Sequence, residues 1–311
     1  MLLKQVLELY EILDDPKADG AAVIRYLRGI DPNVQAETYP LRGEKGVTHM
    51  VKIRVPGENG KAVGGNAPTL GVLGRLGGLG ARPEMIGYVS DGDGAIAALA
   101  VAAKAIDMRR KGDTLPGDLF VSTHVCPDAP TRPHDPVPFM DSPVSIAQVN
   151  QEEISSDLDA ILSIDTTKGN RVINTRGFAI SQPVKEGYIM RLPEELLDIM
   201  QRTTGQLPFV FPINTQDITP YGNEVHHINS IMQPCTCTDA PVIGVAITTQ
   251  ATVPGCGTGC SHYQDIEEAA RFCLEVAKSF GRREACFFDE ADFQMLQRRY
   301  GSMKRLQTLG K

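Results

Sequence analysis

Acidic and histidine side chains occur in this sequence at points where apolar, strand-like runs end. Asp91 and Asp93 lie in SDGDG, directly after the run MIGYV. His124 lies near the end of the run FVSTHV, and Asp165 ends the run ILSID. Carboxylates and imidazoles are common ligands of divalent metals, and they also serve as general acids and bases. These residue types at these points predict a site that holds a cation or moves protons.

Two further residues extend this set. His262 lies in GCSHYQD, between a strand-like run and a helix-like run. Arg75 lies in LGRLGG, at the end of another strand-like run. A guanidinium group can hold a substrate carboxylate with two parallel hydrogen bonds, so Arg75 is the predicted substrate-binding residue.

The elements that must position these residues alternate between strand and helix patterns. Strand-like runs cover residues 47–57, 69–78, 84–90, 118–124, 159–167, 177–184 and 240–249, and helical periodicity covers 2–13, 20–28, 91–108, 192–204 and 264–281. This alternation predicts an α/β fold, a three-layer sandwich with a central mixed, mainly parallel sheet. We expect one domain over residues 1–311, with a helical N-terminal segment, 1–45, packed on it.

Ligands of such folds bind outside the carboxyl ends of the strands, so the polar residues that follow strands should converge there. Asp91 is expected to cap the helix over 91–108 and also to project into the cleft, with Asp93 as the alternative. Capping alone would also explain an Asp at this point. The proline-rich stretch 126–143, with His134, Asp135 and Asp141, is either a rim or lid of the cleft or a passive surface loop.

Composition limits the classes of function. A net charge of −7 and the lack of a basic cluster argue against nucleic-acid binding. No stretch is long and apolar enough to span a bilayer, and the N-terminus does not have the pattern of a secretory signal. Seven cysteines, an odd number, favour a reducing, cytoplasmic location over a disulfide framework. Cys235, Cys237, Cys256 and Cys260 together with His262 leave a structural zinc site or a nucleophilic thiol open.

The order of these motifs resembles the zinc metallo-aminopeptidase superfamily of the phosphorylase/hydrolase-like fold. SDGDGAIAAL (90–99) is similar to that family's Asp-Asp-x-x-Gly helix start, LSIDTT (162–167) to its strand-ending Asp, and GCSHYQDIEEAARFCLEVAKS (259–279) to its late His and final helix. The resemblance covers residues 69–281 in order and character. The chain is also similar to a bacterial family known only as a domain of unknown function, which implies no activity.

Two motifs depart from the peptidase pattern. Where that family has His-x-Asp, this chain has Arg75 and Gly77, and where it has a Glu-Glu pair, this chain has Thr123 and His124. The full dinuclear mechanism therefore does not carry over.

The resemblance implies a divergent metal-dependent hydrolase of an amide or peptide-like bond in a small anionic substrate. The implied ligands of one divalent cation, zinc among the candidates, are Asp91, His124, Asp165 and His262. Asp93 or His124 would then act as the acid or base. Two alternatives stay open, namely a non-catalytic relative that binds a small anionic metabolite and a thiol-dependent protein centred on Cys256 and Cys260. A small-molecule or short peptide-like substrate is the expected partner, and assembly into a homo-oligomer stays open.

Overall fold

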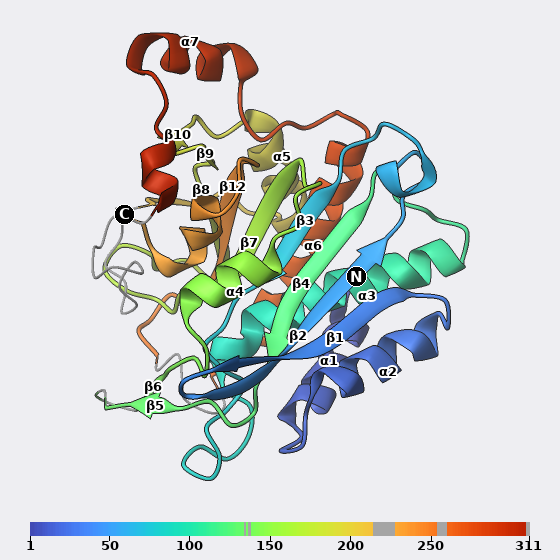
Figure 1. Cartoon of the computed structure of the whole chain (residues 1–311), viewed down its shortest axis with the longest axis vertical. Helices are drawn as coiled ribbons and strands as arrows, with labels where there is room; N and C mark the ends of the chain where they lie inside the picture. The colour runs from blue at the N-terminus through green and yellow to red at the C-terminus, as the bar shows by residue number, and fades with distance from the viewer. Residues whose placement is uncertain (134, 136–137, 214–227, 254–259, 309–311) are drawn as a thin grey trace.

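A central sheet organises the molecule (Figure 1). The computed structural model describes residues 1–133, 135, 138–213, 228–253 and 260–308. Within these residues ten strands form one sheet in the order β1-β2-β4-β3-β7-β12-β8-β11, with β9 beside β12 and β10 beside β9. Their bounds are β1 Gln35–Gly43, β2 Gly46–Val55, β3 Leu70–Gly74, β4 Leu119–Val125, β7 Ala160–Thr166, β8 Gly177–Ser181, β9 Val184–Lys185, β10 Tyr188–Ile189, β11 Val210–Phe211 and β12 Val242–Thr248.

The four central strands, β4, β3, β7 and β12, run parallel, and antiparallel strands flank them on both sides. Nearly every residue of these four strands is buried, as expected where helices cover both faces of a parallel sheet. The predicted three-layer sandwich with a mixed sheet and a parallel centre is confirmed.

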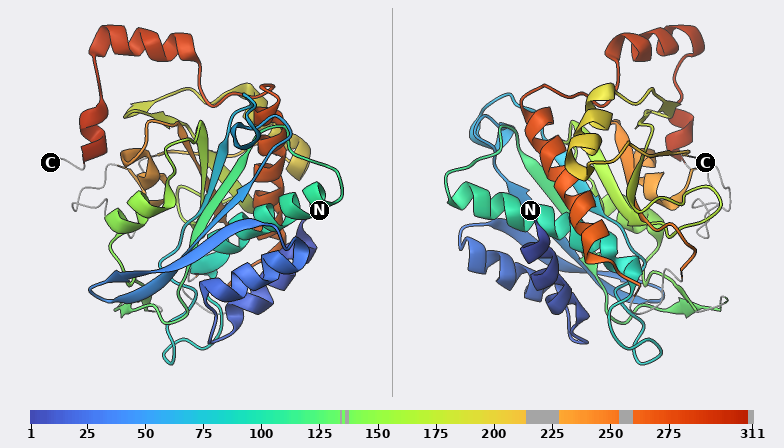
Figure 2. Two further views of the ribbon diagram at one scale, coloured as in Figure 1. Left: turned by 45° about the vertical axis from the view of Figure 1, so that its right-hand side comes forward. Right: turned by 180° about the vertical axis from the view of Figure 1, so that it is seen from behind.

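Helices form the two outer layers, as the view from behind in Figure 2 shows. One face carries α3 (Asp93–Arg110) and α6 (Tyr263–Gly281), with α1 (Leu3–Asp14), α2 (Gly20–Ile30) and α5 (Glu194–Thr204) on the same side. The other face carries α4 (Ile146–Glu153) and the 3-10 helix η3 (Ser230–Thr236). Helix α7 (Glu290–Tyr300) extends away from this body in both figures.

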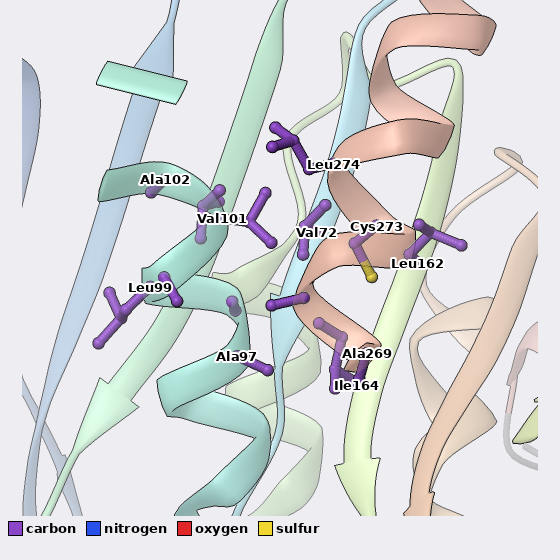
Figure 3. Packing of buried hydrophobic residues seen from close by; sticks show 14 of the residues in the cluster. Val72, Ala97, Leu99, Val101, Ala102, Leu162, Ile164, Ala269, Cys273 and Leu274 are labelled. Carbon is purple, nitrogen blue, oxygen red and sulfur yellow. The ribbon is translucent and has the colours of Figure 1, made fainter. Parts of the chain in front are cut away.

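The alanine-rich sequence of α3 lets this helix lie against the sheet on one side and against α1 and α6 on the other. Residues from Ala95 to Ala103 are all completely buried. Figure 3 shows α3 side chains such as Ala97 and Val101 packed toward Val72 of β3 and Cys273 of α6. Small side chains are needed because the approach is close.

The N-terminal segment differs from the prediction. Residues 1–45 are not helical throughout, because Gln35–Gly43 forms the edge strand β1, paired antiparallel with β2. None of the residues of β1 is buried, and few of them are apolar. The segment is therefore a strand because it pairs with β2, and not because it buries an apolar face.

The segment 84–90 also differs, because it forms no strand of the sheet. Gly87 adopts a φ of +95°, which interrupts an extended run, and Ile86 is 77 % exposed. The segment instead makes isolated backbone contacts, such as the hydrogen bond from Val89 N to Leu79 O. Met85 and Val89 fill a side cluster with Ala81 and Met140, and Tyr88 joins the main core.

None of the helices in the described part of the chain has both the length and the apolar character of a membrane span.

Candidate active site at the carboxyl ends of the strands

Asp93 is the centre of a buried polar cluster at the carboxyl edge of the sheet. It is the first residue of α3, and the next residue, Gly94, packs so closely that a Cβ there would lie 2.6 Å from Ile164 O of β7. The Asp93 side chain is fully buried. Its Oδ2 accepts a hydrogen bond from Lys168 Nζ at 3.2 Å, and its Oδ1 accepts one from Ser261 Oγ at 2.5 Å.

The environment of Asp93 shifts its acidity toward neutral pH. Burial raises the pKa of Asp93 to about 6, and the Lys168 ammonium, the Ser261 hydroxyl and the charge of His262 act in the opposite direction. A carboxyl group with a pKa near neutral can accept a proton at physiological pH and return it, which is the property of a general acid–base group.

His262 and Asp265 form the outer part of the same cluster. His262 Nδ1 lies 3.2 Å from Asp265 Oδ2, and the His262 side chain is 48 % exposed while that of Asp265 is 4 % exposed. Arg176 Nε lies 3.8 Å from Asp265 Oδ1 on the solvent side, with its own side chain 63 % exposed. Burial raises the pKa of Asp265, and the charges of His262, Lys168 and Arg176 oppose this. The cluster therefore leads from solvent at His262 to the fully buried Asp93.

Asp91 has another role from the one expected. It does not cap α3, because the helix begins after a 3-10 turn over Ser90–Gly92 and Gly92 holds the N-cap position. Asp91 Oδ2 instead accepts hydrogen bonds from the backbone amides of Gly77 and Gly78, at 2.7 and 2.9 Å. Burial raises the pKa of Asp91 to about 6, the two amides lower it, and the charge of Asp93 raises it further.

Asp165 ends β7, as predicted, at the same edge of the sheet. Its Oδ1 accepts a hydrogen bond from the backbone amide of Thr166 at 2.7 Å. Thr166 Oγ1 in turn donates to Ser90 O at 2.8 Å, which ties the end of β7 to the turn before α3.

The His124 ring is held between two protein partners. Its Nδ1 lies 2.8 Å from Thr48 Oγ1, and its Nε2 lies 3.1 Å from Leu76 O. Burial lowers the pKa of His124 to about 4, and the charge of Arg75 lowers it further. The neutral ring then donates through Nε2 to the Leu76 carbonyl and accepts through Nδ1 from the Thr48 hydroxyl, so both ring nitrogens are engaged.

Arg75 is held inside the protein on the face of the sheet that carries α4. Its Nη1 donates to Asn150 Oδ1 at 2.9 Å and to Glu153 Oε1, and the side chains of Arg75 and Glu153 are only 6 % and 1 % exposed. An internal carboxylate thus takes the place that was predicted for a substrate carboxylate.

The proline-rich stretch lies beside this edge. It forms a small hairpin of β5 (Thr131–Arg132) and β6 (Phe139–Met140), and a Cβ at Gly77 would lie 3.1 Å from both Met140 O and Asp91 Oδ2. Asp141 binds Arg132 at 3.1 Å and also Lys45 within the protein. His134 lies outside the described residues.

The residues present do not fit the implied divalent cation. Among the residues that the structure describes, no three His, Cys, Asp or Glu side chains are arranged to hold a metal ion. Both oxygens of Asp93 already accept hydrogen bonds from Lys168 and Ser261, and both ring nitrogens of His124 are engaged.

The cysteines that the structure describes form no cluster with the geometry of a zinc site. Cys235 is buried, with its pKa raised to about 12 by burial, so its thiolate is strongly disfavoured. Cys237 and Cys260 are free thiols. Cys256 lies outside the described residues.

Sequence reasoning missed Lys168 and Ser261, the two direct partners of Asp93. Both occupy sequence positions that could have indicated them: Lys168 follows Asp165 by three residues, and Ser261 directly precedes His262. Lys and Ser are common in loops, however, and their proximity to Asp93 spans 75 and 168 residues of sequence.

The fold of this chain is similar to the folds of two solved aminopeptidases and a glutaminyl cyclase. The cytosol aminopeptidase of Coxiella burnetii is 14 % identical to this chain, with a TM-score of 0.51. The match covers 87 % of this chain and 67 % of the aminopeptidase. An M17 aminopeptidase of Trypanosoma brucei is 12 % identical with a TM-score of 0.50, covering 86 % and 61 %. A glutaminyl cyclase of an Acidobacteriales bacterium is 12 % identical with a TM-score of 0.53, covering 91 % and 94 %.

Residues 40–310 match the family described as protein of unknown function (DUF1177), and the chain belongs to that family. No curated protein matches the sequence. At these identities the solved structures establish a shared fold and no more. The predicted resemblance to the aminopeptidase fold is thus confirmed for the architecture.

Proposed function

We propose that this protein is a hydrolase of an amide or peptide-like bond in a small anionic substrate, with its active site at Asp93 and Ser261. The observation that carries the proposal is the hydrogen bond between the half-buried Ser261 hydroxyl and the fully buried Asp93 carboxylate, whose pKa is raised to about 6. A hydroxyl bonded to a base is the arrangement that activates a serine as a nucleophile. The similarity of the fold to that of aminopeptidases is consistent with this reaction class.

In the proposed reaction, Asp93 accepts the Ser261 hydroxyl proton while Ser261 Oγ attacks the carbonyl carbon of the substrate amide. The tetrahedral intermediate then collapses, the C–N bond breaks, and protonated Asp93 returns the proton to the leaving amine. Water attacks the resulting acyl-Ser261 ester with Asp93 again as the base, which releases the acid and regenerates the hydroxyl. The net reaction consumes one water and yields one acid and one amine.

The Arg176 guanidinium at the mouth of the cluster supports an anionic substrate. Arg176 is well exposed beside the buried Asp265, so it offers positive charge to a substrate carboxylate, and the exposed His262 ring next to it offers a hydrogen-bond partner. Arg176 replaces Arg75 in this role, because Arg75 is already paired with Glu153 inside the protein.

A panel of dipeptides and N-acetylated amino acids tests the proposal, with release of the free amine as the readout. Wild-type protein should cleave a member of the panel, and Asp93→Asn and Ser261→Ala should each lower kcat by about 10² to 10⁴. Asp118→Asn is the matched control, because Asp118 is a buried carboxylate that binds the amides of Gly57 and Ala62, outside the Asp93 cluster. Equal cleavage by wild type and Asp93→Asn would contradict the proposal. A protein that binds panel members without cleaving them would support the non-catalytic alternative.

A further inference from the structure

We propose that the ammonium group of Lys168 is the cation of the Asp93 site and takes the place of a bound divalent metal there. The inference concerns metal binding first, and it rests on the proposed function only for its catalytic consequence. It follows from the contacts of Asp93, because Lys168 and Ser261 already occupy both oxygens of its carboxylate.

Lys168 balances the charge of the buried Asp93 carboxylate. Its side chain is 5 % exposed, Asp93 is fully buried, and Nζ lies 3.2 Å from Asp93 Oδ2. A buried charge is tolerated when an opposite charge pairs with it, and removal of one partner leaves the other uncompensated. The charge of Lys168 also acts on Asp265, where it opposes the rise in pKa that burial causes.

The loop that carries Lys168 is fixed against the end of β12. Thr167 N donates to Ile247 O at 2.9 Å, and Gly169 N donates to Thr249 Oγ1 at 2.9 Å. A Cβ at Gly169 would lie 2.3 Å from Thr249 O, so the loop lies directly on the neighbouring strand. Thr167 and Gly169, the neighbours of Lys168 in sequence, are thus both hydrogen-bonded at the end of β12. These bonds fix the backbone of Lys168 beside Asp93.

An added divalent cation would have to share this space with the ammonium. Among the described residues, Asp93 is the carboxylate that pairs with Lys168, and its other oxygen accepts a hydrogen bond from the Ser261 hydroxyl. A cation placed at Asp93 would be repelled by Lys168 at contact distance in a region of low dielectric constant. Lys168 thus opposes metal binding at Asp93 and itself supplies the positive charge there.

Metal binding by the full-length protein tests this inference. Protein purified without chelator should contain no stoichiometric metal, and titration with Zn²⁺ or Mn²⁺ should show no tight site in the wild type. Lys168→Ala leaves the Asp93 carboxylate without its cation, so its affinity for Zn²⁺ should rise by about tenfold or more. The double variant Asp93→Asn/Lys168→Ala removes both charges and should lose that gain.

Two results would overturn the inference. One is a stoichiometric, chelator-removable metal in the wild type, and the other is a Zn²⁺ affinity that Lys168→Ala leaves unchanged. If Lys168→Ala does not fold, the wild-type measurement still decides, and the double variant, which has no unpaired buried charge, reports whether folding failed through Asp93.

A pH profile separates the charge of Lys168 from a merely structural role. The groups that face Asp93 are Lys168, the Ser261 hydroxyl, His262, Asp91 and Tyr88. Among these, Lys168 opposes the rise of the Asp93 pKa most strongly, so Lys168→Met should move the acid limb of the amide-cleavage profile upward by about one to three pH units. Lys168→Arg keeps the charge and should restore the wild-type limb.

The outcomes distinguish this inference from the proposed function. Metal-free protein that cleaves no amide contradicts the hydrolase and leaves the role of Lys168 intact. Cleavage that disappears with chelator and returns with Zn²⁺ contradicts the role of Lys168 and leaves the hydrolase intact.

Discussion

At the scale of single residues, the site depends on a carboxyl group that the fold keeps away from water. Asp93 carries a negative charge inside the protein, and Lys168 and Ser261 are its direct partners. The sequence indicated Asp93, Asp165 and His262 because they follow strand-like runs. It did not indicate the partners, since a contact across 168 residues follows from the chain path and not from local spacing.

The raised pKa of Asp93 should make stability depend on pH. Its pKa is about 6 in the folded protein and ordinarily 3.8, so between these values the folded state binds a proton that the unfolded state has released. The Asp93 carboxyl therefore stabilises the fold less as pH rises from about 4 to about 6. Relative to Asp93→Asn, the wild type should lose up to about 3 kcal/mol of unfolding free energy over that range.

Urea unfolding at a series of pH values measures this difference. Asp118→Asn retains Asp93 and should follow the wild-type dependence. A difference between wild type and Asp93→Asn that is constant from pH 4 to 6 would contradict the burial argument for Asp93.

At the scale of elements, the strand-to-helix junctions hold the site, and here sequence patterns were most informative. The strands over 70–74, 119–125, 160–166 and 242–248 and the helices over 93–110 and 263–281 all agree with their predicted runs. Strong apolar or helical periodicity made these elements recognisable. β1 was missed because its sequence, QAETYPLRG, contains a proline and few apolar residues, and 84–90 was mistaken for a strand because Tyr88 and Val89 fill a core instead.

Close contact between α3 and the sheet is predicted to be essential for the site. A Cβ at Gly94 would lie 2.6 Å from Ile164 O and 2.9 Å from Arg75 O, so Gly94→Ala should push the start of α3 away and lower stability by about 1–3 kcal/mol. Gly29→Ala is the matched control, because a Cβ at Gly29 of α2 meets nothing within 4 Å. That variant should gain about 0.5–1 kcal/mol from helix propensity. Thermal unfolding of both variants checks the pair, and an equal response would contradict the close approach.

At the scale of the whole molecule, the N-terminal helices belong to the same core as the sheet. The family match begins at residue 40, yet Val6 and Leu9 of α1 share a buried cluster with the sheet. Leu2 N donates to Glu267 Oε1 of α6 at 2.9 Å, and the Tyr10 ring lies 5.2 Å from the Tyr263 ring. These contacts support the prediction of one domain over residues 1–311, which stays a prediction.

The chain covers 94 % of the glutaminyl cyclase and 61–67 % of the two aminopeptidases. The chain thus matches only a part of the length of each aminopeptidase. Any chemistry proposed for it therefore rests on its own residues. We propose Asp93, Lys168 and Ser261 for that chemistry. The start of α3, the loop after β7 and the segment before α6 bring them together.

The most direct test of this account is a search for the acyl-enzyme on Ser261. Wild-type protein is incubated with 4-nitrophenyl acetate, and peptide mapping by mass spectrometry locates the acetyl group. We predict acetylation of Ser261 in the wild type, none at that position in Ser261→Ala, and a strong loss in Asp93→Asn, because Asp93 accepts the hydroxyl proton. Acetylation of Ser261 at the same rate in wild type and Asp93→Asn, or an unmodified Ser261 while the protein cleaves amides, would contradict the proposed site.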